Sequence, residues 1–170
     1  MSQLITQLLA ETDLEGLQVT EEDTVDLQKV FTKVAQYFAP LVVRQNRLIE
    51  VTGAETRVLV NGLEGPLEQA VRNLLQNALK FSYPGTTVTI DVGADRSVGV
   101  INRADPVPDE MRERIFERFL RADRKVAGSG LGLSIVKRVV DAHAATIEVS
   151  HTPEGATEFR IRFSERASAD

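Results

Sequence analysis

Three alternating glycines lead directly into a helical pattern in the stretch Ala127-Gly128-Ser129-Gly130-Leu131-Gly132-Leu133-Ser134-Ile135-Val136-Lys137. The spacing of the apolar residues predicts a helix from Leu131 to about His143, with one buried face that includes Ile135, Val139 and Val140. Glycines let the backbone approach a ligand closely, and the free N–H groups of a first helical turn attract phosphate. Taken alone, the stretch fits a phosphate site and a flexible loop before a core helix equally well.

The segment before these glycines excludes a dinucleotide-binding fold. Such a fold needs a buried strand immediately before the glycines. Residues 121–125 instead read Arg-Ala-Asp-Arg-Lys, which is too polar for a buried strand. We therefore set the dinucleotide interpretation aside.

The composition is that of a globular protein with a sizeable core. The chain has 170 residues, of which 42% are hydrophobic and 26% charged, and this fits a single domain. It has no cysteine and two histidines, which excludes disulfides, thiolate metal sites and multi-histidine zinc sites. The formal net charge of -5 argues against nucleic acid as a partner. No apolar run approaches the length of a membrane span and no signal peptide pattern opens the sequence, so we expect a cytoplasmic protein without direct membrane contact in this segment.

The order of helical and alternating patterns predicts an α/β (α+β) sandwich. Helices are expected over residues 26–43, 66–81 and 131–143, with Pro40 kinking or ending the first. Strands are expected around Val25 and over residues 47–51, 57–60, 87–92, 97–101, 146–150 and 157–163. We also expect hairpins across residues 52–55 and 153–155, a short helix over 108–116 and a mobile loop over 118–130. This mixture favours helices on one face of a mixed sheet.

The helix over residues 66–81 carries a polar pattern beside its apolar one. The predicted buried side chains of this helix are Leu67, Ala70, Val71, Leu74, Ala78 and Phe81. Those of the helix over residues 26–43 are Val30, Val34, Phe38 and Leu41. Asn73, Asn77 and Lys80 are spaced i, i+4 and i+7, and share the opposite face. The simpler interpretation is a solvated polar face. The functional one is a magnesium site, because a carboxamide oxygen is a hard ligand and Lys80 adds charge near phosphates.

Two further stretches fit a ligand site. Residues 100–108 form a strand followed by a turn, and strand ends are common ligand sites. In residues 114–121, Phe116 and Phe119 are expected to anchor the start of the loop and leave Arg118 and Arg121 for phosphate. Each stretch alone fits a turn or a basic surface. Together with the glycine stretch, they make a nucleotide site the best single explanation.

In this order, the series resembles the ATP-binding catalytic domain of sensor histidine kinases, in the Bergerat ATPase superfamily. Residues 67–82 are similar to the N box, 100–108 occupy the place of the first glycine box, 115–119 resemble the F box and 128–133 the second glycine box. The resemblance implies a Bergerat fold, with a mixed sheet of about five strands packed against three helices. It also implies a domain division into the end of a dimerisation hairpin (1–15), a linker (16–23), the catalytic domain (24–165) and a tail (166–170).

The resemblance assigns roles to matching positions. Asn77, Lys80 and Arg121 are expected to be catalytic: Asn77 holds Mg²⁺, Lys80 contacts phosphate and Arg121 approaches the γ-phosphate. Asn73 supports the phosphates. The full set of expected ATP-binding residues is Asn73, Asn77, Lys80, Phe81, Asn102, Ala104, Val107, Arg118, Arg121, Gly128, Ser129, Gly130, Leu131, Gly132 and Leu133.

The chain departs from the family pattern in two places. The first glycine box usually has an aspartate that accepts the adenine amino group, followed two residues on by glycine. Asn102 and Ala104 stand at these positions. The phosphoacceptor histidine segment is also absent, because His143 and His151 both lack the acidic residue and proline that follow the acceptor, and we expect structural roles for both.

The resulting expectation is the catalytic part of a two-component sensor histidine kinase. It binds Mg-ATP and transfers the γ-phosphoryl group to a histidine on a separate domain, so the protein-histidine kinase is incomplete in this chain. The expected partners are its own dimerisation and phosphoacceptor domain and a response regulator receiver domain, in a homodimeric receptor of the inner membrane. The alternatives are a nucleotide-sensing pseudokinase or scaffold, which the altered glycine box favours, and an anti-sigma-type serine kinase, which the hairpin-like residues 1–15 argue against.

Overall fold

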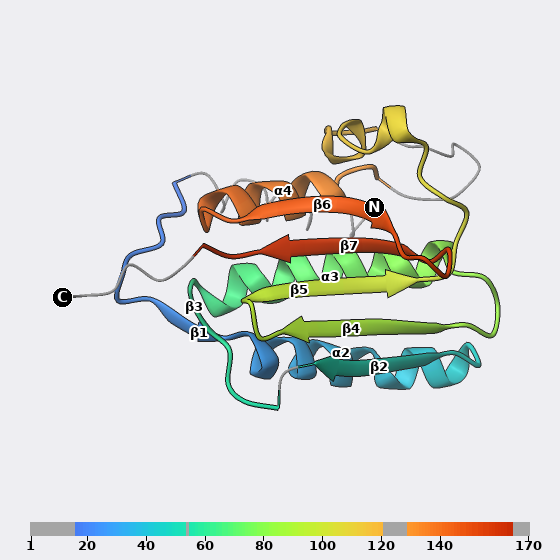
Figure 1. Cartoon of the computed structure of the whole chain (residues 1–170), viewed down its shortest axis with the longest axis horizontal. Coiled ribbons are helices and arrows are strands. Elements are labelled where there is room, and N and C mark those ends of the chain that lie inside the picture. Colours follow the sequence, from blue (N-terminus) through green and yellow to red (C-terminus); the bar gives the residue numbers. More distant parts are fainter. Residues whose placement is uncertain (1–15, 54, 121–128, 165–170) are drawn as a thin grey trace.

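The computed structural model describes residues 16–53, 55–120 and 129–164. A five-stranded mixed sheet with the order β2-β4-β5-β7-β6 has helices α2, α3 and α4 on one face, as Figure 1 shows. A separate two-stranded sheet joins β1 to β3. The predicted sandwich, with a mixed sheet of five strands against three helices in the described residues, is confirmed.

Most elements lie close to their predicted positions. The helices are α2 (Leu27–Arg44), α3 (Glu64–Phe81) and α4 (Gly132–Ala142), with 3-10 turns η1 (Asp109–Met111) and η2 (Arg114–Phe116). The strands of the large sheet are β2 (Leu48–Gly53), β4 (Thr87–Gly93), β5 (Ser97–Asn102), β6 (Thr146–His151) and β7 (Thr157–Arg162). The small sheet consists of β1 (Thr24–Asp26) and β3 (Leu59–Asn61). In the part of the chain described here, no helix is both long and apolar enough to cross a membrane.

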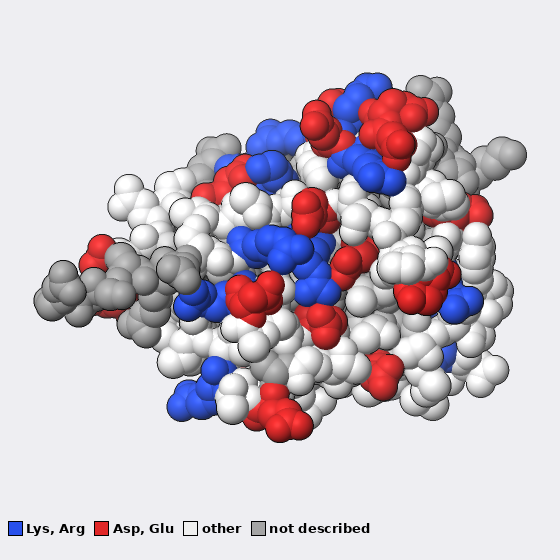
Figure 2. All heavy atoms as spheres, in the orientation of Figure 1, with Lys and Arg blue, Asp and Glu red and all other residues white. Residues whose placement is uncertain are grey.

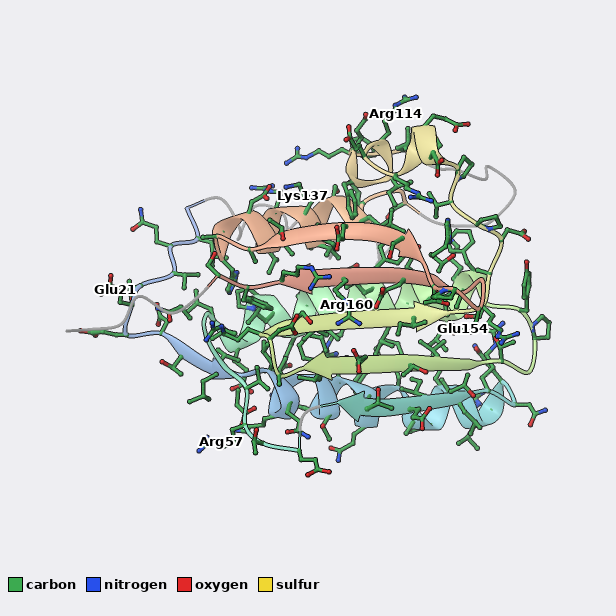
Figure 3. The ribbon with its side chains drawn as sticks, in the orientation of Figure 1. Glu21, Arg57, Arg114, Lys137, Glu154 and Arg160 are labelled. Carbon is green, nitrogen blue, oxygen red and sulfur yellow. The ribbon has the colours of Figure 1, made fainter. Side chains whose placement is uncertain are left out.

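The two faces of the large sheet have opposite character. On the inner face, Ile90 pairs with Val100 and Val100 with Phe159, and all three are buried against the helices. On the outer face, the Arg160 guanidinium donates to Asp91 at 2.9 Å and to Glu158 at 2.5 Å (Figure 3). Basic and acidic side chains alternate over this face in Figure 2. A ligand site buried in the fold therefore lies on the helix side of the sheet.

Helix α2 starts as predicted but does not end at Pro40. The Asp26 carboxylate accepts the Gln28 N–H at 3.1 Å and caps the first turn. The helix continues through Pro40 to Arg44, because Pro40 lies on the exposed side, where the carbonyl that the proline leaves unpaired can be solvated. The predicted burial of Leu41 is wrong, since Leu41 is 42% exposed. Val42, one turn after Phe38, is buried instead.

The predicted hairpin across residues 52–55 is wrong, although both of its strands exist. β2 pairs in parallel with β4, whereas β3 pairs with β1 in the other sheet. Alternating apolar and polar residues identify a segment as a strand, but they do not show which other strand it pairs with. The hairpin of β6 and β7 is confirmed.

Three smaller expectations need correction or lie outside the described residues. Helix α3 begins at Glu64, two residues early, and the predicted burial of Phe81 is wrong because this side chain at the helix end is 37% exposed. The short helix over 108–116 is instead the two turns η1 and η2. The expectations for residues 1–15, for most of the 118–130 loop and for the tail at 166–170 fall outside the described residues.

Candidate functional site

Helices α3 and α4 meet at Asn73 and Gly132. Asn73 is only 9% exposed, and its Nδ2 donates to the Gln69 carbonyl at 2.9 Å. A Cβ on Gly132 would lie 3.3 Å from Asn73 Oδ1, so a glycine there lets the start of α4 lie directly beside this carboxamide. The expectation that Asn73 faces away from the core is therefore wrong, because α3 is buried on its α4 side as well as on its sheet side.

The first turn of α4 presents backbone donors. Leu131 is the N-cap residue and provides no side-chain cap, so no hydroxyl or carboxylate at that position covers the N–H groups of the turn. Ser129 Oγ accepts the Leu131 N–H at 3.2 Å, and Gly130, with φ of 75°, turns the chain into the helix. Leu131, Ile135, Val139 and Val140 are fully buried, as the sequence predicts. The helix start is thus fixed in position, and its N-cap side chain leaves the first N–H groups of the turn uncapped.

The end of β5 is fastened to the C-terminal half of α3. Asn102 is 3% exposed, and its Nδ2 donates to the Ala78 carbonyl at 3.4 Å. The Tyr83 N–H donates to the Arg103 carbonyl at 2.8 Å, and Ala104 is buried beside them. These contacts bring Asn102 next to the turn of α3 that carries Asn77.

Thr157 is a residue that the sequence analysis missed. It pairs with Asn102 across the β5–β7 ladder, is 3% exposed, and its hydroxyl has no hydrogen-bond partner among the described residues. Buried hydroxyls are normally paired, so an unpaired one beside a buried asparagine marks a place for a polar ligand group. The available signal was a threonine at a core-facing position of the alternating strand 157–163, but its partner strand was unknown.

The other predicted residues on α3 lie at its surface. Asn77 is partly exposed, and Lys80 is exposed with its Nζ 4.9 Å from the centroid of the Phe81 ring. An ammonium above an aromatic face is held by a modest attraction. Asn73, Asn77 and Lys80 therefore extend from the buried helix contact out to solvent along one helix.

The loop residues are placed only in part. Phe116 packs edge-on against Phe159, with ring centroids 6.4 Å apart, and anchors the segment as predicted. Phe119 does not anchor it through its side chain, which is 63% exposed; its N–H instead donates to the Gly130 carbonyl at 3.0 Å. Arg118 is exposed. The predicted site residue Val107 has its carbonyl 3.3 Å from His151 Nε2. Arg121 and Gly128 lie outside the described residues.

Comparison with known proteins identifies this arrangement. A family model described as "Histidine kinase-, DNA gyrase B-, and HSP90-like ATPase" matches residues 62–167. The sensor histidine kinase CusS of Escherichia coli O157:H7 is 34% identical over 98% of this chain, and the chain spans 36% of the length of that relative. The probable sensor histidine kinase TcrY of Mycobacterium tuberculosis is 42% identical over 62% of this chain and 23% of its own length.

Solved structures agree with this result. The mycobacterial sensor histidine kinase MprB superposes with a TM-score of 0.70 at 29% identity, covering 82% of this chain and 94% of that one. Full-length ShkA, solved in complex with AMPPNP, gives a TM-score of 0.74 at 25% identity, covering 98% of this chain and 37% of that one. The chain belongs to the family of histidine kinase-, DNA gyrase B- and HSP90-like ATPases.

Proposed function

We propose that this chain is the catalytic ATP-binding domain of a two-component sensor histidine kinase. The observation that carries the proposal is the buried pair of Asn102 and Thr157 at one end of α3, together with the uncapped start of α4 beside Asn73. The first feature provides polar groups for a base, and the second provides donors for phosphate. A nucleotide triphosphate has both kinds of group.

Asn102 and Thr157 form the base end of the proposed site. Because Asn102 Nδ2 is directed to the Ala78 carbonyl, Oδ1 remains as an acceptor, and an adenine amino group is a donor. The unpaired Thr157 hydroxyl donates to, or accepts from, the same edge of the base, directly or through a water molecule. The base thus satisfies polar atoms that the empty fold leaves buried.

The phosphate end consists of α3 and α4. The N–H groups of Gly132 and Leu133 and the positive end of the α4 dipole attract the phosphates, and Lys80 adds a point charge. The described residues contain no cluster of three histidine or carboxylate ligands for a resident metal. A single carboxamide oxygen at Asn77 suits Mg²⁺ that arrives with the phosphates, because Mg²⁺ takes most of its ligands from water and phosphate. When bound, that cation neutralises charge that develops on the phosphates.

The proposed reaction moves the γ-phosphoryl group to a histidine on a separate domain. A ring nitrogen of that histidine forms a bond to phosphorus while the bond from phosphorus to the β-phosphate oxygen breaks, and ADP leaves. Catalysis of this transfer depends mainly on position and charge. Asn73 and the α4 N–H groups hold the nucleotide, Lys80 balances negative charge, and Arg121 is proposed to approach the γ-phosphate. The proposed partners are a dimerisation and phosphoacceptor domain and a response regulator, in the cytoplasm.

Two measurements on the purified chain test the proposal. Calorimetric titration should show one site for ATP that binds more tightly with Mg²⁺ than with a chelator. Incubation with γ-labelled ATP should leave the chain unlabelled, whereas a histidine phosphoacceptor domain added in trans should gain acid-labile, base-stable label. Binding without transfer to any acceptor domain would favour a nucleotide-sensing module, which the departures at Asn102 and Ala104 permit. Absence of nucleotide binding would overturn both interpretations.

A further inference from the structure

The two ring nitrogens of His143 connect helices that are distant in the sequence. His143 is the C-cap residue of α4 and is 6% exposed. Its Nε2 lies 3.0 Å from the backbone nitrogen of Leu63, the N-cap residue of α3, and its Nδ1 lies 2.7 Å from the Val139 carbonyl. Leu63 has no side-chain cap of its own, so a histidine from α4 holds the start of α3.

These contacts determine the protonation state of the imidazole. A carbonyl can only accept, so Nδ1 carries the hydrogen and donates to Val139. The Leu63 N–H can only donate, so Nε2 carries a lone pair. The neutral tautomer with hydrogen on Nδ1 satisfies both contacts. A protonated ring would direct an N–H at the N–H of Leu63 and lose that contact.

The ring is also enclosed sterically. A Cβ on Gly62 would lie 2.9 Å from His143 Cδ2, so the imidazole packs directly against the Gly62 backbone. The charged group that acts on the imidazole is Asp23, in the segment before β1. Its carboxylate accepts hydrogen bonds from the N–H and the hydroxyl of Thr20. On the packed helices, the neighbouring charges are paired, Glu64 with Lys33 and Asp141 with Lys137.

The contact with Leu63 connects the C-terminal end of α4 to the start of α3. Ten residues separate Leu63 from Asn73 on α3, and eleven separate Gly132 from His143 on α4. At 1.5 Å per residue, these spans are about 15 and 17 Å. The two helices therefore run antiparallel, with the contact between His143 and Leu63 at the end of α4 and the close approach of Gly132 to Asn73 at its start. Moving α4 by one residue along its axis would remove Gly132 from Asn73.

We propose that His143 is a positioning residue, whose neutral ring holds the first turn of α4 beside Asn73 and thereby sets the affinity of the site for nucleotide. This inference rests on the proposed function. Loss of a residue that orients metal ligands typically weakens a metal site by about tenfold or more, and we expect a comparable effect where a residue positions the donors of a nucleotide site. We therefore expect affinity for ATP to fall about tenfold when the contact with Leu63 is removed. Affinity should also decline as the pH falls below the lowered pKa of His143, because the ring then becomes protonated.

Two variants separate the hydrogen bond from the volume of the ring. His143→Phe keeps an aromatic ring, somewhat larger than imidazole, but has no acceptor for the Leu63 N–H, and should bind ATP about tenfold more weakly. His143→Gln provides a carboxamide oxygen as a non-titrating acceptor, and should restore most of the affinity and remove the decline in affinity at low pH. The control is Val42→Ala in α2, which creates a cavity in a helix that does not carry the site.

The outcomes distinguish this inference from the proposed function. If wild-type protein does not bind ATP, the proposed function fails, and the inference is then decided by the Gly132 amide in nuclear magnetic resonance spectra without nucleotide. That resonance should shift in His143→Phe and remain in place in Val42→Ala. If wild-type protein binds ATP and His143→Phe binds it equally well, or if Val42→Ala loses as much affinity, His143 is only a structural residue and the inference is overturned. An unchanged Gly132 resonance in His143→Phe would overturn it as well.

Discussion

Asn102 and Thr157 lie opposite each other on the inner face of the sheet, and of the two side chains only Asn102 donates a hydrogen bond within the described residues. The Asn102 carboxamide donates to the Ala78 carbonyl at 3.4 Å, whereas the Thr157 hydroxyl is buried without a partner among the described residues. A buried unpaired hydroxyl destabilises a fold by about 1–3 kcal/mol. The fold without ligand retains this cost, and a bound base can remove it.

Thr157→Val should therefore have opposite effects on stability and on binding. The valine has almost the same shape without the hydroxyl, so we expect the free energy of unfolding without nucleotide to rise by about 1 kcal/mol. Loss of the hydroxyl should weaken ATP binding by about 1 kcal/mol, or roughly fivefold. Urea denaturation and calorimetry measure the two effects, with Thr157→Ser as the control that keeps the hydroxyl. Equal ATP affinity in the valine variant and the wild type would remove Thr157 from the base site.

Asn102→Asp should change nucleotide preference. A carboxylate accepts the adenine amino group through a charge-assisted hydrogen bond, about twice as strong as a neutral one. We expect ATP affinity to rise about fivefold to tenfold, with no gain for GTP. If the Asn102 carboxamide were free to rotate, its NH2 group could also donate to the guanine carbonyl, and discrimination between ATP and GTP would be modest. The hydrogen bond to Ala78 opposes that rotation, so the structure predicts a clearer ATP preference in the wild type.

The same variant should be less stable without nucleotide. An ionised carboxylate cannot donate to the Ala78 carbonyl and places two acceptors face to face, which we expect to lower the free energy of unfolding by about 1–2 kcal/mol. Thermal denaturation measures this effect, and Asn102→Ser, a smaller and uncharged variant, serves as the control. Weaker ATP binding by Asn102→Asp would show that the base does not lie at the end of β5.

Asn77→Ala should reduce nucleotide affinity only when Mg²⁺ is present. The carboxamide is partly exposed on α3, and alanine is the better helix former, so the variant should fold normally. If Asn77 supplies an oxygen ligand to the cation, its loss should weaken Mg-ATP binding and leave binding in a chelator unchanged. Gln76→Ala, at the neighbouring exposed carboxamide, is the matched control for calorimetry. An equal loss with and without Mg²⁺ would assign Asn77 to another role.

Most elements of the fold could be predicted because each carries its own local periodicity. The apolar face of α4 and the alternation in β4, β5 and β7 depend on neighbours in the sequence, and they are found where they were expected. The partner strands of β2 and β3 could not be predicted from the local sequence. β2 pairs with β4 and β3 pairs with β1, and both partners lie elsewhere in the chain.

The candidate site divides in the same way. Asn73, Asn77 and Lys80 share one helix, and the glycine stretch is continuous, so their patterns are visible in the sequence. Thr157 gains its meaning from Asn102, which is on another strand, and His143 from Leu63, 80 residues earlier. Such residues become recognisable only when tertiary contacts show what faces them.

His143 should make stability depend on pH. Burial lowers the pKa of His143 below its ordinary value of 6.5, against the opposing effects of the Val139 carbonyl and Asp23. With a lowered pKa, the unfolded state binds more protons than the folded one, so the stabilisation is complete above about pH 6.5 and declines as the pH falls below it. Thermal denaturation of the wild type and His143→Gln between pH 5 and about 7.5 tests this. The glutamine variant should lose less stability over the range, and parallel curves would contradict the assignment.

Helix α4 ends in a conformation that suits glycine but contains alanine. The Ala145 N–H donates to the Val140 carbonyl and the Ala144 N–H to the Asp141 carbonyl, both at 3.0 Å, which is the Schellman pattern of hydrogen bonds. Ala144 has a φ of 48°, in the left-handed region. An L-residue other than glycine is strained there by about 1–2 kcal/mol. The strain lies immediately after His143, at the end of the helix that the candidate site depends on.

Ala144→Gly should therefore stabilise the protein. Glycine relieves about 1–2 kcal/mol of strain but loses about 0.5–1 kcal/mol through the greater freedom of the unfolded chain, so the net gain in the free energy of unfolding should be about 0.5–1 kcal/mol. Ala142→Gly makes the same change at the last residue of α4, where the backbone is still helical, and should instead destabilise by about 0.5–1 kcal/mol. Urea denaturation of both variants provides the comparison. If both substitutions destabilise the protein equally, Ala144 is not strained, and the end of α4 does not adopt the left-handed turn.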